Sequence, residues 1–157
     1  MPTTIRRLLL GVTAVTVMVV PSLQLTVAKA ASNEQYDGKD PSYQGCNNNA
    51  ITAYSAPLKD GHSSTIWGYA DLRYSTTCRT VWIRLRSITG GCIPFEDKCG
   101  QGHVHRNSDG HEQFCQIDQG GQTQCTSNML GDANDSSFAQ GHLDEGPYTA
   151  SGKTPSY

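Results

Sequence analysis

Apolar and polar residues alternate most regularly along residues 66–86. Every second residue from Ile66 to Tyr74 is small or apolar, and the same alternation returns over residues 81–85. A period of two residues, rich in β-branched and aromatic side chains, is typical of strands that bury one face. The polar segment 75–77 separates the two runs and is expected to form a turn. The pattern therefore predicts a β-hairpin.

Two further segments have weaker strand patterns. Residues 50–57 alternate up to Pro57, and residues 102–116 surround a turn-forming tip at residues 107–110. After residue 30, no stretch repeats with the 3.6-residue period of an amphipathic helix. We therefore expect an all-β fold, a small disulfide-stapled β-sandwich or β-barrel-like domain that is built from hairpins.

The first 30 residues have the pattern of a cleavable export signal. Arg6 and Arg7 precede an uncharged, mostly apolar run over residues 8–20, which is too short to span a bilayer comfortably as a helix. Ala28-Lys29-Ala30 supplies the small residues that signal peptidases require. We predict a signal peptide over residues 1–30, secretion, and no membrane association after cleavage. The paired arginines leave both the general secretory route and the twin-arginine route open.

The rest of the chain divides into an arm and a domain. Residues 31–45 are polar, so we expect an exposed N-terminal arm, and its simplest interpretation is a disordered terminus. The alternative is a segment that docks on another protein through Tyr36 and Tyr43, because tyrosine adds contact area at little entropic cost. Residues 46–157 are predicted to form a single disulfide-rich β domain.

The charge balance excludes two classes of partner. Three of the 12 basic residues lie in the predicted signal peptide, so nine basic residues face 14 acidic ones after it, a net charge of −5. Nucleic acids and anionic lipid surfaces require a basic face, and we expect neither as a partner. Large apolar residues are also sparse in this part of the chain, and a core this lean needs cross-links.

Six cysteines, all after residue 30, supply those cross-links. An even number in a small exported chain predicts three disulfides, each of which stabilises by about 2–4 kcal/mol through restriction of the unfolded chain. For the last four, we favour Cys92–Cys99 with Cys115–Cys125 over the nested pairing Cys92–Cys125 with Cys99–Cys115. A turn at residues 119–122 places Cys115 and Cys125 opposite each other if its loop has three residues, but on opposite sides if it has two. The six are Cys46, Cys78, Cys92, Cys99, Cys115 and Cys125.

Several short motifs suggest a family. They are Tyr36-Asp37-Gly38-Lys39-Asp40-Pro41, Gly45-Cys46, Leu72-Arg73-Tyr74-Ser75 with Cys78 and Trp82, Asn128-Met129-Leu130, Asp132-Ala133 and Tyr148-Thr149-Ala150. Together they resemble the secreted actinobacterial family catalogued as domain of unknown function 2690, over residues 36–88 and 126–157. The resemblance implies export, a similar fold class and a Cys46–Cys78 pair, and it supplies no reaction. Residues 91–124 depart from the family's pattern.

Three histidines lie in the second predicted hairpin, and its register decides what they can do. With a four-residue tip, His103 and His105 share one face and His111 lies on the other. With a three-residue tip, all three share a face with Cys115. Only the three-residue tip is expected to build a zinc or copper site. We expect no metal, because an oxidising compartment favours disulfides and the spacing matches no common zinc motif.

No complete catalytic motif is present. Serine, histidine and aspartate occur without the nucleophile-elbow context of a serine hydrolase. The acidic pairs at residues 96–97 and 144–145 lie in predicted loops, where carboxylates are usually just solvated. A ribonuclease-like pair of His105 and Glu112 arises with the four-residue tip, but the acidic net charge is a poor match to RNA. We therefore expect a non-catalytic protein without a cofactor.

One face of the first hairpin combines aromatic and basic side chains. We expect its tryptophan to belong to the core, whereas the arginines either pair with the acidic excess or contact a partner. By the alternation, this face carries Tyr69, Arg73, Trp82, Arg84 and Arg86.

These patterns favour a binding role. We expect a secreted, non-catalytic binding or adaptor protein, such as a subunit of a larger extracellular assembly, whose partner is an extracellular protein or, less readily, a glycan. The alternative is an inhibitor of a secreted hydrolase, in which the short loop between Cys92 and Cys99 presents Phe95 to an active site. A small antimicrobial protein is a further alternative.

Overall fold

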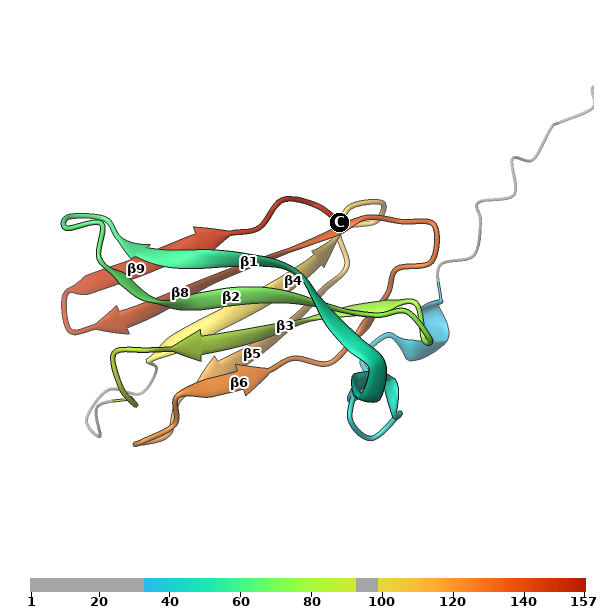
Figure 1. Ribbon diagram of the computed structural model, residues 1–157, viewed down its shortest axis with the longest axis horizontal. Coiled ribbons are helices and arrows are strands. Elements are labelled where there is room, and N and C mark those ends of the chain that lie inside the picture. Colours follow the sequence, from blue (N-terminus) through green and yellow to red (C-terminus); the bar gives the residue numbers. More distant parts are fainter. Residues whose placement is uncertain (1–32, 93–98) are drawn as a thin grey trace, which may run out of the picture.

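The structure, a computed structural model, describes residues 33–92 and 99–157 (Figure 1). The predicted signal peptide therefore lies outside the described residues. Within them the chain forms nine β-strands and two short 3₁₀ helices, η1 (Glu34–Tyr36) and η2 (Cys46–Asn49). The strands are β1 (Ala50–Asp60), β2 (Ile66–Ser75), β3 (Thr80–Ser87), β4 (Gly100–Arg106), β5 (Glu112–Ile117), β6 (Gln124–Thr126), β7 (Leu130–Gly131), β8 (Ser137–Glu145) and β9 (Tyr148–Lys153).

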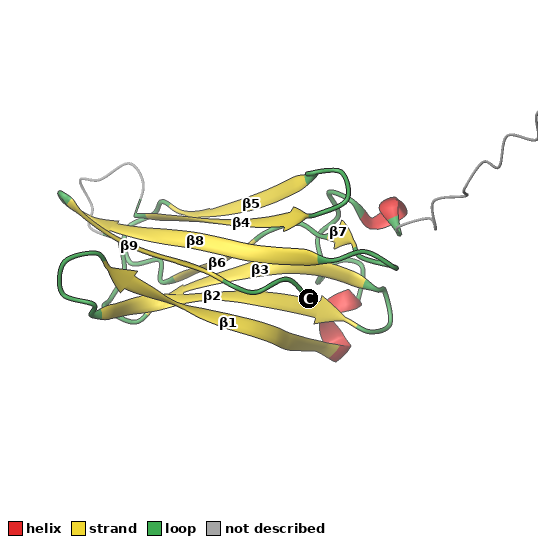
Figure 2. Cartoon of the chain, turned by 90° about the horizontal axis from the view of Figure 1, so that it is seen from above, coloured by secondary structure: helices red, strands yellow, loops and turns green. Residues whose placement is uncertain are grey.

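All nine strands belong to one antiparallel sheet that folds back on itself. The strand order is β5-β4-β8-β9-β1-β2-β3-β6, and β7 pairs with β3. In Figure 2, β5, β4, β8 and β9 form one layer, and β3, β2 and β1 form the other. The layers join where Lys59 and Asp60 at the end of β1 pair with β9. The prediction of an all-β, barrel-like fold is confirmed.

A disulfide links the two ends of this strand order. Among the described strands, β5 pairs with β4 alone and β6 with β3 alone. Cys115 of β5 and Cys125 of β6 are nevertheless bonded, with Cα atoms 5.7 Å apart. The predicted turn between the two cysteines does not form a hairpin, because residues 118–123 carry the chain from one layer to the other. The disulfide thus closes the sheet where no backbone ladder does.

The remaining four cysteines also form disulfides. Cys46 is bonded to Cys78 and Cys92 to Cys99, with Cα separations of 5.7 and 5.1 Å. All six cysteines are therefore paired. The nested alternative for the last four does not occur, and the Cys46–Cys78 bond is the one that the family resemblance implies.

The predicted 66–86 hairpin is formed by β2 and β3. Ser75 pairs with Thr80, so the turn occupies residues 76–79 and begins one residue later than predicted. The alternating apolar side chains of both strands point between the layers. The large residues of this core are Leu58, Trp67, Leu72, Val81, Ile83, Leu85, Val104, Ile117, Leu130 and Leu143.

Glycines allow the two layers to approach closely. A Cβ atom on Gly102 of β4 would lie 2.8 Å from Cδ1 of Ile83 and 3.2 Å from Cβ of Leu85. A Cβ atom on Gly141 of β8 would lie 2.7 Å from Cδ1 of Leu85. The side chains of β3 therefore fill the space that side chains on the facing strands would need, and a chain with few large apolar residues still packs its interior.

The N-terminal arm lies against the β domain. Backbone hydrogen bonds of 3.0 and 2.9 Å join it to Met129. Asp37 accepts hydrogen bonds from the Gly131 amide at 2.6 Å and from Nη1 of Arg106 at 3.0 Å. The expected disordered terminus is therefore wrong for residues 33–45, although many of them are exposed. The sequence holds no local signal of this docking, because Asp37 and Arg106 are 69 residues apart.

A second, smaller apolar cluster forms where the arm meets the sheet. Trp82, which is 1% exposed, packs with Met129 and with the Cys46–Cys78 disulfide. The half-buried Tyr36 packs against the same cluster. The expectation that Trp82 belongs to the core is confirmed.

Candidate functional site

The aromatic and basic face of the first hairpin exists, but its charges are paired within the sheet. Asp71 of β2, whose side chain is 1% exposed, accepts hydrogen bonds from Nη2 of Arg84 at 2.8 Å and Nε of Arg86 at 2.7 Å. Oγ of Ser55 on β1 donates to the same carboxylate at 2.6 Å. Burial alone would raise the pKa of Asp71, but the hydrogen bonds from Arg86, Ser55 and Arg84 outweigh it and lower that pKa.

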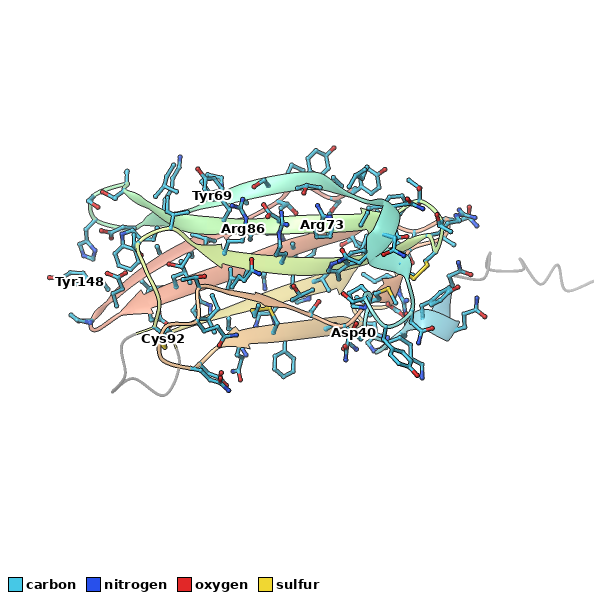
Figure 3. All side chains as sticks on the ribbon, turned by 60° about the horizontal axis from the view of Figure 1, so that its bottom comes forward. Asp40, Tyr69, Arg73, Arg86, Cys92 and Tyr148 are labelled. Atoms are coloured by element: carbon cyan, nitrogen blue, oxygen red, sulfur yellow. A yellow bond between two sulfur atoms is a disulfide. The ribbon has the colours of Figure 1, made fainter. Side chains whose placement is uncertain are left out.

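The other residues of this face are engaged as well. Nη1 of Arg73 donates to Oγ1 of Thr52 at 2.6 Å, and Nη2 donates to a backbone carbonyl of β1 at 3.1 Å. The guanidinium of Arg86 lies 4.9 Å from the ring centroid of Tyr69, as a cation–π contact. Figure 3 shows Tyr69, Arg73 and Arg86 on the hairpin. The structure thus brings Tyr69, Arg73 and Arg84 to one face and gives each an intramolecular contact.

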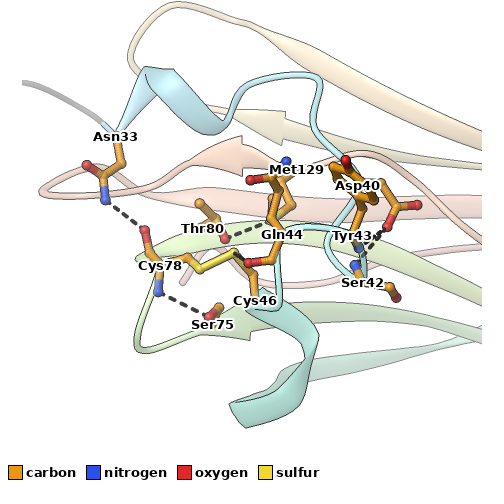
Figure 4. Close-up of a disulfide and its surroundings, with 10 residues drawn as sticks. All are labelled: Asn33, Asp40, Ser42, Tyr43, Gln44, Cys46, Ser75, Cys78, Thr80 and Met129. Atoms are coloured by element: carbon orange, nitrogen blue, oxygen red, sulfur yellow. Dashed lines mark hydrogen bonds between the residues drawn. A yellow bond between two sulfur atoms is a disulfide. The ribbon is translucent and has the colours of Figure 1, made fainter.

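The two tyrosines proposed for the arm differ in their exposure. Oδ1 of Asp40 accepts hydrogen bonds from the amides of Ser42 and Tyr43, both at 2.8 Å, beside the Cys46–Cys78 disulfide (Figure 4). This turn leaves Tyr43 87% exposed, whereas Tyr36 packs against the domain. Phe95 lies outside the described residues.

The second hairpin, β4–β5, adopts the four-residue tip. His105 pairs with Glu112 in the register. Nδ1 of His103 lies 2.6 Å from Oε1 of Glu112, and Nδ1 of His105 lies 3.1 Å from Oε2. His111 lies elsewhere, with Nδ1 3.2 Å from Oδ2 of Asp37. The His105–Glu112 pair expected with a four-residue tip is present, and His103 lies on the same face, so this register also brings three potential metal ligands together.

Aromatic rings cover part of this cluster. The ring centroid of Phe138 on β8 lies 4.7 Å from that of His105, and the centroid of Phe114 on β5 lies 6.0 Å from that of His103. Burial lowers the pKa of His105 by more than the Glu112 carboxylate raises it. Burial thus favours the neutral imidazole of His105, whose Nδ1 faces Glu112 and whose Nε2 lies 3.0 Å from the Gln140 amide.

A shallow depression opens beside His103 on the outer face of β4, β8 and β9. It has a volume of about 480 Å³, and its lining includes His103, Gln140, His142 and Lys153. Nζ of Lys153 lies 3.7 Å from the ring centroid of Phe138. Imidazole, amide and ammonium groups suit polar ligands better than apolar ones.

A tyrosine cluster that the sequence analysis missed lies along β1. The ring centroid of Tyr157 is 6.1 Å from that of Tyr54 and 4.9 Å from that of Tyr74. Ile51, Tyr54 and Tyr157 are 48%, 39% and 43% exposed. We call Ile51, Tyr54, Tyr74 and Tyr157 the tyrosine edge. Tyr157 is far from the other three residues in the sequence, so no local pattern predicts its contact with them. The only sequence signal for this cluster was the alternation that predicts a strand over residues 50–57.

This cluster adjoins a free strand edge. In the part of the chain that the structure describes, the residues of Ile51–Ala56 pair with β2 alone, except Ala53, which lies at a register shift between Thr52 and Tyr54. The adjacent strand β9 reaches β1 only at Lys59 and Asp60. The backbone amide and carbonyl groups on the other side of this segment have no ladder there. Such an edge is a template for an added strand.

Two features of the structure are informative about where the protein resides in or outside the cell. Three disulfides indicate an oxidising environment. The described residues contain no helix that is long and apolar enough to cross a membrane.

Comparison with known proteins gives one family and one named relative. A family model described as "Protein of unknown function (DUF2690)" matches residues 34–140. A curated relative, the uncharacterized protein YjfA of Bacillus subtilis (strain 168), is 30% identical over 111 residues. This alignment covers 65% of the present chain and 66% of the relative, slightly less than two thirds of the relative's length. No solved structure matches.

Proposed function

We propose a binding function for this chain, which belongs to the DUF2690 family of proteins of unknown function. It acts as a secreted, non-catalytic module that receives an extended segment of an extracellular protein along β1. The observation that carries this proposal is the free edge at Ile51–Ala56 beside the tyrosine edge.

The chemistry of this surface suits a peptide strand. The amides and carbonyls of Ile51–Ala56 that pair with no described strand supply main-chain hydrogen bonds, as in other cases of strand addition. Exposed tyrosine rings supply large contact areas and lose little entropy on binding. The disulfides hold the scaffold rigid, so less ordering remains to be done when the partner arrives.

The arginine face is a weaker candidate for this role. Arg84 and Arg86 each donate to the buried Asp71, and a partner that recruited either arginine would leave part of a buried carboxylate without its hydrogen bonds. That loss is costly in a low-dielectric site. The tyrosine edge requires no such exchange.

The test compares two isoleucines of similar exposure. Ile51 lies on the free edge and is 48% exposed, whereas Ile88 follows β3 and is 57% exposed. The tagged protein is used to capture its partner from the culture medium of its own host, and affinities are then measured with the purified partner. Ile51→Lys should weaken binding about tenfold or more, because charge on an edge opposes strand addition, while Ile88→Lys should bind like the wild type.

Hydrogen exchange supplies a second, structural readout. Binding of the partner should slow amide exchange across residues 50–56, since an added strand protects these amides. Equal affinities for the two variants, protection confined to other strands, or the absence of any captured partner would each contradict the proposal.

The inhibitor alternative rests on a different segment. The Cys92–Cys99 disulfide brings the ends of the loop between them to a Cα separation of 5.1 Å, and a short closed loop loses little entropy on entering an active site. Under this alternative, Phe95→Ala abolishes binding while Ile51→Lys retains it.

A further inference from the structure

We propose that His103, His105 and Glu112 bind a divalent transition-metal ion, Zn²⁺ or Cu²⁺, on the outer face of the β4–β5 hairpin. One potential ligand atom from each of these residues lies within 4.8 Å of the other two. The site is separate from the tyrosine edge and independent of the proposed binding function.

The donor set fits such an ion. Two imidazoles and one carboxylate form the ligand set of many zinc and other transition-metal sites. Magnesium and calcium favour sites of oxygen ligands only, so they are not expected here. Zinc binds imidazole nitrogen and carboxylate oxygen at about 2.0–2.2 Å, which places ligand atoms on one ion about 3–4 Å apart. The separation of 3.1 Å between His105 and Oε2 of Glu112 falls in that range, whereas the 2.6 Å between His103 and Oε1 is the shorter distance of a hydrogen bond.

The backbone prearranges these three side chains. His103 and His105 are two residues apart on one strand, so they project from the same face. Glu112 is the cross-strand partner of His105, which brings its carboxylate between the two imidazoles. The side chains of His103 and His105 are only 22% and 19% exposed, and the Phe138 ring is stacked on His105. Metal binding would therefore need little ordering of the histidines.

Gln140 can orient one of the ligands. Its amide lies 3.0 Å from Nε2 of His105. If the amide turns over, its oxygen accepts a hydrogen bond from Nε2–H, and Nδ1 of His105 then presents its lone pair toward Glu112. A histidine that binds a metal through one nitrogen usually donates the other N–H to such a partner.

Three protein ligands leave room for a fourth. Tetrahedral zinc with three protein ligands keeps an open position for water or another small ligand. The depression of about 480 Å³ beside His103 contributes space for it, with Gln140, His142 and Lys153 at its lining. The ammonium of Lys153 favours an anionic occupant of that position.

A metal-free explanation of the same contacts makes a different prediction. If Glu112 served only as an ion-pair partner for the two histidines, the cluster would have no measurable preference for Zn²⁺ or Cu²⁺ over Mg²⁺. A chelating site prefers Cu²⁺ and Zn²⁺, in line with the general order of divalent-metal affinities.

The test uses the disulfide-bonded protein, purified with a tag that contains no histidine and stripped with a chelator. Isothermal titration should find one Zn²⁺ per chain, and Mg²⁺ should not bind. His103→Asn, His105→Asn and Glu112→Gln should each weaken Zn²⁺ binding about tenfold or more. His111→Asn is the matched control outside the cluster and should bind like the wild type.

Spectroscopy on the wild type keeps the proposal falsifiable even if a variant misfolds. The electron paramagnetic resonance spectrum of bound Cu²⁺ should show hyperfine coupling to imidazole nitrogen. Failure of the wild type to bind either ion, a Cu²⁺ spectrum without nitrogen coupling, or equal Zn²⁺ affinity in folded His105→Asn and Glu112→Gln would overturn the proposal.

Discussion

Asp71 and Asp132 are two buried carboxyl groups whose surroundings shift their pKa values in opposite directions. At Asp71, hydrogen bonds from two arginines and a serine outweigh burial, and the pKa is lowered. At Asp132, burial dominates and raises the pKa from 3.8 to about 6, although Oγ of Ser137 donates a hydrogen bond at 2.6 Å. Nothing in the sequence distinguishes the two, because the difference lies in neighbours that other strands supply.

Asp132 should make the protein less stable as the pH rises from about 4 to about 6. A raised pKa means that the folded state holds a proton in this range that the unfolded state has released. The free energy of unfolding therefore falls across this window, by roughly 3 kcal/mol at most, and the contribution is constant above it. Asp132→Asn should remove this dependence.

Chemical denaturation between pH 4 and pH 8 measures the effect. The difference in unfolding free energy between Asp132→Asn and the wild type should grow in favour of the variant up to about pH 6 and then level off. Asp118→Asn, at an exposed position, should keep the wild-type slope. A difference that does not change with pH would show that the burial of Asp132 has no such effect.

At the level of elements, the sequence predicts a strand or turn well where the residues that determine it are close together in the chain. It does not predict pairings that depend on residues far apart in the chain. The 66–86 hairpin was predicted because its alternation and its turn residues are adjacent in the chain. The tip of β4–β5 was left open because Asn107 and Gly110 suit both loop lengths, and only the pairing of His105 with Glu112 decides between them. The metal-ligand cluster depended on that register, so the sequence offered the His103–His105 pair and the His105–Glu112 pair without joining them into one site.

The docked arm and the tyrosine edge were not predicted, because both depend on contacts between segments that are far apart in the sequence. The arm docks through Asp37 and the buried Arg106, which stand 69 residues apart. The tyrosine edge needs Tyr157, whose amide and carbonyl bond with Ser137 near the start of β8. Polar segments such as these have no apolar period, and a propensity argument treats them as loops.

Packing between elements predicts a cost for Gly102→Ala. The new Cβ would lie 2.8 Å from Ile83 and 3.2 Å from Leu85, and the latter atom is a Cβ that cannot rotate away. We expect a loss of about 1–3 kcal/mol of stability, as for other overpacked cores.

Gly61→Ala is the matched control for this substitution. A Cβ there would meet nothing within 4 Å, so the free energy of unfolding should stay nearly the same or rise slightly. Thermal or urea unfolding of the two variants checks both expectations. Equal stability of the two would mean that the layers have more room than Gly102 indicates.

At the scale of the whole molecule, the three disulfides have different structural roles. Cys46–Cys78 anchors the arm beside Trp82, and Cys92–Cys99 closes a short loop. Cys115–Cys125 joins strands at opposite ends of the strand order. It links the two layers on the side where β5 and β6 do not pair with each other through the backbone. Because a disulfide joins the two ends of the sheet, the fold can be stable with few large apolar residues in its core.

If Cys115–Cys125 closes the sheet, its removal should have a different effect from the removal of a disulfide that only constrains a loop. Cys115–Cys125 and Cys92–Cys99 span 10 and 7 residues, and loop entropy alone makes their contributions differ by only about 0.3 kcal/mol.

If Cys115–Cys125 closes the sheet, the double variant Cys115→Ser/Cys125→Ser should lose about 2–4 kcal/mol and in addition open β5 and β6 locally. Amide exchange in these two strands should then quicken far more than in β1 and β2, as measured by mass spectrometry. Cys92→Ser/Cys99→Ser should leave exchange in β5 and β6 close to that of the wild type. Similar exchange patterns in the two double variants would mean that packing of the layers, rather than the Cys115–Cys125 disulfide, holds β5 and β6 in place.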